Sequence, residues 1–279
     1  MPSPYSHNRT INYAETLGQG VCRTPALSGL VGCDRRRLDG GEVLVPAPHD
    51  NPAAGQTETM ADTAIFDVDG TLVDTNYQHA LAWFRAFRRY GITLPMWRIH
   101  RGIGMGGDMF VPEVAGREVE QAHGDDLRKA WVEEFDQLIG EIQPFEGAHE
   151  LLAEVKERGF RLVLASSGKT QHVEAFLDLI DGKSVADAWT TSDDVAKSKP
   201  EPDIVATALA KVEGASGIMV GDSIFDAQAA AKLKIPVIGV RTGGFSVGEL
   251  QEAGVLQVFD SLVAFRQALD GTPLARASR

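Results

Sequence analysis

The chain has 279 residues, of which 43% are hydrophobic and 24% charged, so it can bury a large core and hold one domain with an insertion. Its formal net charge of −12 argues against nucleic acid or an anionic membrane as a partner. The sequence has no apolar run of transmembrane length, and its two cysteines, Cys22 and Cys33, support neither a disulfide framework nor a thiol nucleophile. We expect a cytoplasmic protein that is a monomer or a homodimer.

Residues 1–59 differ from the rest of the chain. They hold six of the 13 prolines and show no sustained helical or strand period. This composition fits either a disordered extension or a start assigned too far upstream, because Met60 stands just ahead of the first predicted strand. The sequence leaves these two interpretations open.

The first predicted strand is a short apolar stretch, residues 63–66, that leads into the run Asp67-Val68-Asp69-Gly70-Thr71-Leu72-Val73-Asp74. A strand of this composition can be buried on both faces. Side chains two apart on a strand point the same way, so Asp67 and Asp69 leave its carboxyl end toward one pocket, and Gly70 allows a sharp turn. Two carboxylates so close repel each other and need a shared proton or a cation, which implies a divalent metal. The run alone could also be a metal-binding turn.

Two amphipathic helices are predicted next, at residues 76–90 and 119–139. Their aromatic residues have the spacing of packing positions rather than of a ligand box. Between these helices, residues 100–108 are rich in glycine and follow no strand. Because no strand leads into them, these residues do not predict a dinucleotide loop.

A second strand, residues 161–165, ends at Ser166 and Ser167, just before a helix predicted at residues 170–179. Hydroxyl and backbone N–H groups at a helix N-terminus make an anion site. Ser166 could instead be a simple helix cap. Lys199 follows before a helix predicted at residues 203–212, where a solvated loop lysine is the plain alternative.

A third strand begins at residue 217 and ends at Asp222, with Asp226 four positions later in the first turn of a helix. This spacing keeps both acids on one side. The alternative for Asp226 is a charge favoured by the helix dipole. Strands at residues 236–240 and 257–259 and helices at residues 247–253 and 262–269 complete the pattern. Strands alternating with helices predict an α/β fold with a doubly wound parallel sheet of the Rossmann type.

The run D-x-D-G-T-x-x-D, then Ser166, Lys199 and Asp222 in order after strands, resembles the four motifs of the haloacid dehalogenase (HAD) superfamily. The resemblance covers about residues 63–270 and points to the branch of phosphoglycolate phosphatase and β-phosphoglucomutase. It implies a catalytic core at residues 60–76 and 144–270, a type 1 α-helical cap at residues 77–143, and a flexible tail at residues 271–279. In capped relatives a cap loop selects the leaving group, so residues 100–108 are the expected specificity loop.

The resemblance also implies residue roles, and with them a phosphoric monoester hydrolase. Asp67 is the expected nucleophile and Asp69 the expected acid and base, with Ser166, Ser167 and Lys199 binding phosphate. The expected metal is Mg²⁺, which prefers hard oxygen ligands, held by Asp67, Asp222, Asp226 and the backbone carbonyl of Asp69. The expected substrate is a small phosphorylated metabolite, such as a sugar phosphate or a phosphoglycolate-like compound.

Three residues of the predicted cap are candidates for substrate specificity. His79, His100 and Arg101 are candidate specificity residues, although His100 and Arg101 could be surface residues. A phosphosugar mutase of the β-phosphoglucomutase type is the main alternative, because Asp74, Thr75 and His79 resemble the start of its cap. The arginine that grips the distal phosphate in those mutases aligns near Met105, which argues against that alternative. Asp69 argues against a dehalogenase, and the intact motifs argue against a silent binding protein.

Overall fold

The computed structural model describes residues 61–277. The expectations for residues 1–59 therefore lie outside the described residues. Within the described part of the chain, no helix is both long enough and apolar enough to cross a membrane.

Six parallel strands form one sheet in the order β3-β2-β1-β4-β5-β6. Their bounds are β1 Thr63–Asp67, β2 Arg161–Ala165, β3 Ala188–Thr190, β4 Gly217–Gly221, β5 Val237–Val240 and β6 Gln257–Phe259. The central strand, β1, pairs with β2 on one side and with β4 on the other. The chain thus winds outward from β1 in one direction and restarts at β4 in the other. This arrangement confirms the predicted doubly wound α/β fold and puts the switch point between β1 and β4.

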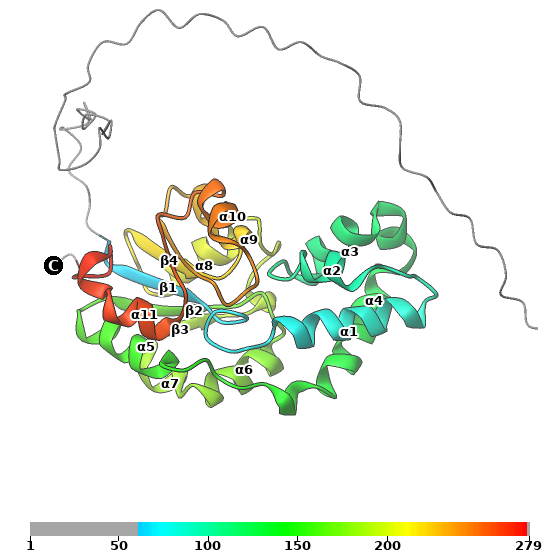
Figure 1. Ribbon diagram of the computed structural model, residues 1–279, viewed down its shortest axis with the longest axis horizontal. Coiled ribbons are helices and arrows are strands. Elements are labelled where there is room, and N and C mark those ends of the chain that lie inside the picture. The colour runs from blue at the N-terminus through cyan, green and yellow to red at the C-terminus, as the bar shows by residue number, and fades with distance from the viewer. Residues whose placement is uncertain (1–60, 278–279) are drawn as a thin grey trace, which may run out of the picture. The chain divides into compact units, whose positions relative to one another are not determined.

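Helices cover both faces of the sheet (Figure 1). On one face lie α5 Ala148–Glu157, α6 Thr170–Leu179, α7 Gly182–Val185 and α11 Leu262–Gln267, and on the other lie α8 Asp203–Lys211, α9 Ile224–Ala231 and α10 Val247–Glu252. Side chains of β1 alternate between two apolar clusters, with Phe66 in one and Ile65 in the other. Because both faces are covered, every residue of β1 is buried, which explains its continuous apolar sequence.

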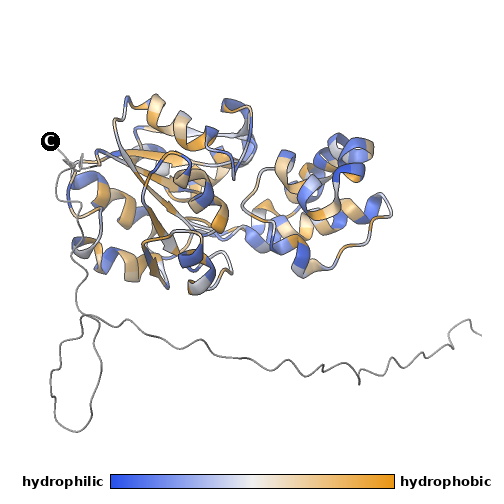
Figure 2. Ribbon diagram, turned by 90° about the horizontal axis from the view of Figure 1, so that it is seen from above, coloured by the Kyte–Doolittle hydropathy of each residue, from blue (hydrophilic) through white to orange (hydrophobic). Residues whose placement is uncertain are grey.

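The inserted segment between β1 and β2 folds into four helices that pack on one another (Figure 1). They are α1 Asn76–Arg89, α2 Met96–His100, α3 Gly107–Ala115 and α4 Arg117–Asp136. Their apolar sides face inward (Figure 2), where Trp83 stacks on Phe110 and on Trp131. We call this group of helices the cap. The sequence predicted α1 and α4 but missed α2 and α3, and the exact limits of the cap remain a prediction.

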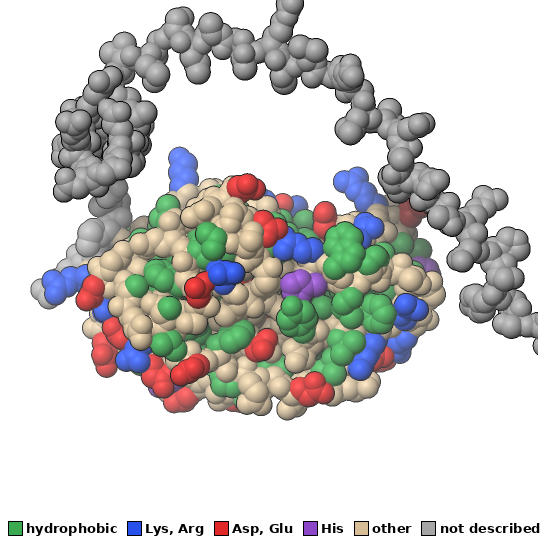
Figure 3. All heavy atoms as spheres, in the orientation of Figure 1, with side chains coloured by type: hydrophobic (Ala, Val, Ile, Leu, Met, Phe, Trp, Pro, Cys, Tyr) green, Lys and Arg blue, Asp and Glu red, His purple; other side chains and the backbone are tan. Residues whose placement is uncertain are grey.

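The surface of the cap also carries large hydrophobic side chains (Figure 3), among them Tyr77, Met96 and Trp97. Tyr77 and Trp97 are 68% and 69% exposed.

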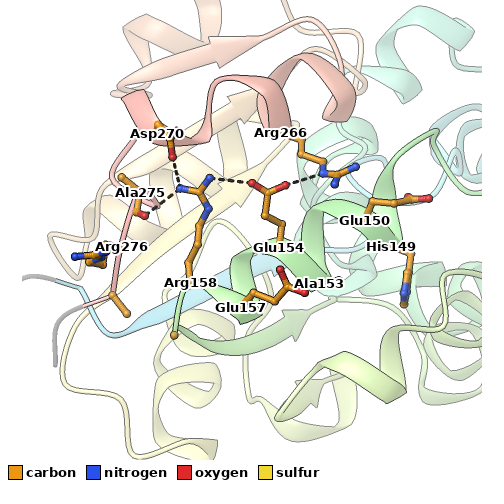
Figure 4. Close-up of a pocket in the computed structure, with 12 residues that line it drawn as sticks. His149, Glu150, Ala153, Glu154, Glu157, Arg158, Arg266, Asp270, Ala275 and Arg276 are labelled. Carbon is orange, nitrogen blue, oxygen red and sulfur yellow. Dashed lines mark hydrogen bonds and ion pairs between the residues drawn. The ribbon is translucent and has the colours of Figure 1, made fainter.

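The last described residues, 272–277, pack on the core, and the flexible tail expected from residue 271 remains a prediction. Leu274 is fully buried, and the Arg158 guanidinium donates to Asp270 at 2.7 Å and to the Ala275 carbonyl at 3.0 Å. Glu154 accepts from Arg158 and from Arg266, each at 2.8 Å, so these charges are paired across a surface hollow (Figure 4). A buried leucine and this ion network fasten the segment, and their partners lie too far away in sequence for a local pattern to reveal them.

Candidate active site

The carboxyl ends of β1 and β4 bring two acids together at the switch point of the sheet. Asp67 is the last residue of β1 and Asp222 directly follows β4, and each is only 3% exposed. Gly70 makes the turn after β1 with a φ of +78°, and a Cβ there would lie 2.5 Å from an Asp222 carboxylate oxygen. A Cβ at Gly243 would lie 1.9 Å from the same oxygen. Two glycines are therefore needed to let the backbone pass close to Asp222.

A third acid, Asp226, completes a buried cluster. One carboxylate oxygen each from Asp67, Asp222 and Asp226 lies within 4.8 Å of the others. Asp226 is held in place because it forms a capping box with Ser223 at the start of α9, where the Ser223 hydroxyl donates to it at 2.6 Å. Lys199 is 2% exposed and pairs with Asp67 and, at 2.8 Å, with Asp226. One lysine thus faces three acids.

The charge imbalance appears in the pKa values of the acids. Burial, together with the charges of Asp226, Asp222 and Asp69, raises the pKa of Asp67 well above its usual value despite the opposing effect of Lys199. Burial and the charge of Asp226 raise the pKa of Asp222 to about 7. A divalent cation would relieve this repulsion, and three carboxylates are the hard oxygen ligands that Mg²⁺ prefers. The residues present therefore fit a site for a divalent metal.

Two residues that sequence reasoning missed hold these acids. The Thr71 hydroxyl lies 2.9 Å from a carboxylate oxygen of Asp67 and 3.1 Å from one of Asp222, and it can donate its proton to one of them at a time. The Asn76 amide donates to Asp222 at 2.9 Å. Thr71 belongs to the aspartate motif and could have been named from it. Asn76 carries no such signal, because its contact spans 146 positions of the sequence.

Asp69 points away from the acid cluster and toward the cap. One of its carboxylate oxygens lies 2.9 Å from His79 Nε2, and the other accepts from the Ser166 hydroxyl at 2.5 Å. The same hydroxyl accepts from the Gly168 backbone N–H at 2.9 Å. Burial raises the pKa of Asp69, but the hydrogen bonds from His79 and Ser166 outweigh it and leave that pKa lowered. His79 is fixed by stacking on Phe135, with ring centroids 4.2 Å apart.

A cavity of about 250 Å³ opens between the acids and the cap. Four groups of residues line it: the predicted catalytic and phosphate-binding residues Asp67, Asp69, Ser167 and Lys199; the cap residues His79, Trp83, Arg128 and Trp131; the glycine-rich loop from Ile103 to Asp108; and Gly168, Lys169, Ser192, Val195, Ala196 and Ser198 of the segments that follow β2 and β3. The Ser167 hydroxyl has no hydrogen-bond partner among the described residues. The expected specificity loop thus does reach the candidate site.

His100 and Arg101 are not among the residues that line this cavity. The Arg101 guanidinium pairs with Glu249 of α10 at 2.5 Å and lies 4.1 Å from the centre of the Phe245 ring. His100 stacks on Tyr77 with ring centroids 5.0 Å apart, and burial lowers its pKa. Arg101 thus joins the cap to the core, and His100 stacks within the cap close to Gly244 of the core, where a Cβ would lie 2.7 Å from its ring.

The glycine-rich loop is also tied to the residue before Lys199. The Ser198 hydroxyl donates to Asp108 at 2.5 Å, and the Ser198 backbone N–H donates to the same carboxylate at 3.2 Å. The Gly106 N–H in turn donates to the Ser198 hydroxyl at 3.0 Å. We call these three contacts the Ser198 latch. The latch connects the cap directly to the segment that carries the buried lysine.

Comparison with known proteins agrees with the geometry. The family model for haloacid dehalogenase-like hydrolases matches residues 64–240, which contain every motif named above. The chain belongs to this family. It is therefore a hydrolase of the HAD superfamily, as the sequence predicted.

Three relatives show how the likeness extends over the described fold. The chain is 27% identical over 211 residues to validoxylamine A 7'-phosphate phosphatase of Streptomyces hygroscopicus subsp. limoneus, covering 71% of this chain and 93% of that one. It is 29% identical over 233 residues to a phosphoglycolate phosphatase of Cupriavidus necator, covering 80% and 99%. A solved hydrolase of Pseudomonas syringae superposes with a TM-score of 0.71 at 31% identity, covering 75% of this chain and 98% of that one.

Proposed function

We propose that the chain is a magnesium-dependent phosphatase that hydrolyses a small phosphate monoester through an aspartyl-phosphate on Asp67. The main support is the buried arrangement in which Asp67 faces Lys199 while Asp69, two residues on, faces His79 and the cap. Without a metal or substrate, burial raises the pKa of Asp67 and hydrogen bonds lower that of Asp69, so the roles are assigned from position and motif. A bound cation would favour the ionised form of Asp67, and a phosphate dianion beside Asp69 would favour its protonated form. The relatives that are named as phosphatases support the same reaction class.

Asp67 and Asp69 have different roles in the two half-reactions. A carboxylate oxygen of Asp67 attacks the phosphorus, and the bond from phosphorus to the ester oxygen breaks. Asp69 gives its proton to the departing alkoxide. Water then attacks the phosphorus of the aspartyl-phosphate, Asp69 takes its proton, and the bond to Asp67 breaks to release inorganic phosphate.

Other residues hold the transferred group in place. Lys199 lies within reach of the nucleophile and can neutralise phosphate oxygens as they gain charge. Ser166 and Ser167 follow the carboxyl end of β2, which lies beside the end of β1. Ser167 lines the cavity, whereas the Ser166 hydroxyl donates to Asp69. A magnesium ion held by Asp67, Asp222 and Asp226, with the backbone carbonyl of Asp69, would neutralise the phosphate dianion beside these acids.

The structure gives the mutase alternative little support. A mutase must retain a bisphosphate, and the best grip on its far phosphate is an arginine fork. Met105, the residue near which the resemblance to those mutases puts that arginine, lines the cavity, and Arg101 pairs with Glu249 outside the cavity. Water should therefore discharge the aspartyl-phosphate.

Phosphate release from p-nitrophenyl phosphate and a panel of phosphorylated metabolites tests the proposal. We expect turnover with Mg²⁺ and none with the Asp67→Asn variant. Incubation with β-glucose 1-phosphate and a trace of glucose 1,6-bisphosphate distinguishes a phosphatase from a mutase. Glucose 6-phosphate forming faster than inorganic phosphate would establish a mutase and contradict the proposal.

A further inference from the structure

A second contact between a histidine and an aspartate joins the cap to the core, besides the one between His79 and Asp69. The Nε2 atom of His172, on α6, lies 2.7 Å from a carboxylate oxygen of Asp136, the last residue of α4. A carboxylate only accepts hydrogen bonds, so the His172 ring carries its proton on this nitrogen. The two contacts are reciprocal, because the cap supplies the histidine in the first and the core supplies it in the second.

Asp136 stands at a position where an acid does not favour the helix itself. The C-terminal end of a helix carries a partial negative charge, so a carboxylate there opposes the helix dipole. The last turn of α4 has no basic residue that would offset this effect. Among the described residues, the side-chain partners of Asp136 are His172 and, at a longer 3.4 Å, the Gln171 amide, both on α6. The contact with the core therefore accounts for an acid at this position better than the helix does.

The orientation of His79 depends on the same end of α4. Its Nε2 atom contacts Asp69, but its Nδ1 atom is buried and has no hydrogen-bond partner among the described residues. Stacking therefore holds the ring, with centroid distances of 4.2 Å to Phe135 and 5.5 Å to Trp131. Both aromatic residues lie near the C-terminal end of α4. A shift of this end would turn the imidazole away from Asp69.

His172 fixes this end of α4 in two ways. Its ring, which is only 1% exposed, packs against Phe135 and Trp131 with centroid distances of 4.9 Å and 5.8 Å. Its hydrogen bond also holds Asp136, the next residue after Phe135 in the chain. Packed side chains thus connect His172 to Asp69 through the aromatic residues of the cap.

We infer that His172 is a positioning residue for Asp69. Its hydrogen bond to Asp136 sets the end of α4, and the stacked rings then keep the His79 N–H on the Asp69 carboxylate. This inference rests on the proposed function, in which Asp69 gives a proton to the leaving group. A general acid must be within hydrogen-bond reach of the atom that it protonates, so the orientation of its carboxyl group matters.

The basicity of the leaving group gives a test that a purely structural role would not pass. Phenyl phosphate and p-nitrophenyl phosphate are similar in shape, but phenolate is the stronger base and needs more help from a general acid as it departs. The ratio of their kcat/KM values, phenyl over p-nitrophenyl, therefore measures how well Asp69 is placed. In the magnesium-loaded full chain, His172→Phe keeps a ring but removes the N–H, and it should lower this ratio by about three- to tenfold. Asp136→Ala, which removes the acceptor, should lower it by a similar factor.

Two variants serve as matched controls. His149→Phe removes another histidine contact of the core, in which Nδ1 lies 3.1 Å from the Ile180 carbonyl oxygen. Asp126→Asn changes an exposed acid in the middle of α4. Both controls should leave the ratio unchanged. If His172→Phe slows both substrates by the same factor, or keeps the ratio of His149→Phe, the inference is wrong.

A double variant tests whether the effect passes through His79. His79→Phe keeps the stacked ring but removes the N–H that faces Asp69, so it should lower the ratio by itself. Adding His172→Phe should then lower the ratio no further, because both substitutions break one path. A second fall of full size would show that His172 acts by another path and would overturn the inference.

Hydrogen exchange gives a measurement that does not depend on turnover. In protein with isotope-labelled histidines, NMR follows the exchange of the His79 Nε2 proton with water. His172→Phe and Asp136→Ala should each speed this exchange by about threefold or more, whereas His149→Phe should not. Unchanged exchange in both variants would overturn the inference even if activity falls.

The same experiments separate the inference from the proposed function. If the wild type hydrolyses p-nitrophenyl phosphate while His79→Phe and His172→Phe keep the wild-type ratio, the phosphatase function stands and the positioning role falls. If the wild type hydrolyses neither compound with Mg²⁺ present, both fall.

Discussion

Removal of the Asp108 carboxylate should disconnect the cap loop from Lys199. Asp108 accepts two hydrogen bonds from Ser198, and Ser198 is buried while Asp108 is exposed. Hydrogen bonds to a charged group contribute about 1.5–3 kcal/mol each, but exposure of the acid reduces this contribution. We expect a total loss of about 1–2 kcal/mol, which corresponds to roughly five- to thirtyfold in kcat/KM. The loss arises because the closed loop and the lysine are no longer held in one geometry.

A double-mutant cycle of Asp108→Ala with Ser198→Ala measures this coupling on p-nitrophenyl phosphate. Since each substitution breaks the same contacts, the double variant should lose little more activity than Asp108→Ala alone. Asp108→Asn should be intermediate, and Glu113→Ala, an exposed acid on the same helix, is the control. Additive losses, or an Asp108→Ala enzyme indistinguishable from Glu113→Ala, would refute the role of the latch.

Three further predictions concern the acid cluster. Activity should require Mg²⁺ and be inhibited by Ca²⁺, whose larger and more flexible coordination lets Asp67 bind through both oxygens; full turnover after exhaustive chelation, measured by phosphate release, would disprove the metal requirement. Asp67→Asn should abolish turnover yet leave the thermal midpoint of the chelated protein unchanged or higher, because it removes one of several clustered negative charges; a large fall in the midpoint would contradict this. The third is a pH effect on stability. The raised pKa of Asp222 means that the folded metal-free protein binds more protons than the unfolded chain, so this contribution to stability is full below about pH 4 and is lost as the pH rises to about 7. In thermal melts from about pH 4 to about pH 7, the chelated wild type should therefore lose stability relative to Asp222→Asn. A melting temperature that depends on pH in the same way in both proteins would contradict this prediction.

Most of the sheet could be predicted from local patterns, because buried strands such as β1 and β2 have continuous apolar sequences between turns. β3, with three residues, was missed, whereas the equally short β6 stands between two predicted helices, where the alternation of strands and helices calls for a strand. The helix α3 was hidden because it starts within the glycine-rich stretch and contains Pro112.

Part of the candidate site could likewise be predicted from local sequence patterns, and part could not. Asp67, Asp69 and Asp222 stand at the carboxyl ends of β1 and β4, so their convergence follows from the parallel topology. Lys199 lies in the segment between β3 and α8 and could be named only from its motif. Asn76, the Ser198 latch and the contact of His172 with Asp136 depend on how the cap packs, and no local signal reports them. The position of Arg101 outside the cavity has the same cause, since its partner Glu249 is 148 positions away.

The central claim is that Asp67 carries the phosphoryl group between the two half-reactions. Rapid mixing of the magnesium-loaded enzyme with substrate, acid quenching and peptide mass spectrometry would test it most directly, with Asp69→Asn used to slow the discharge. We predict a peptide containing Asp67 that is heavier by one phosphoryl group, formed within the first turnover and absent from Asp67→Asn. Turnover with no phosphorylated peptide at any quench time, or with the phosphoryl group on another residue, would contradict the account.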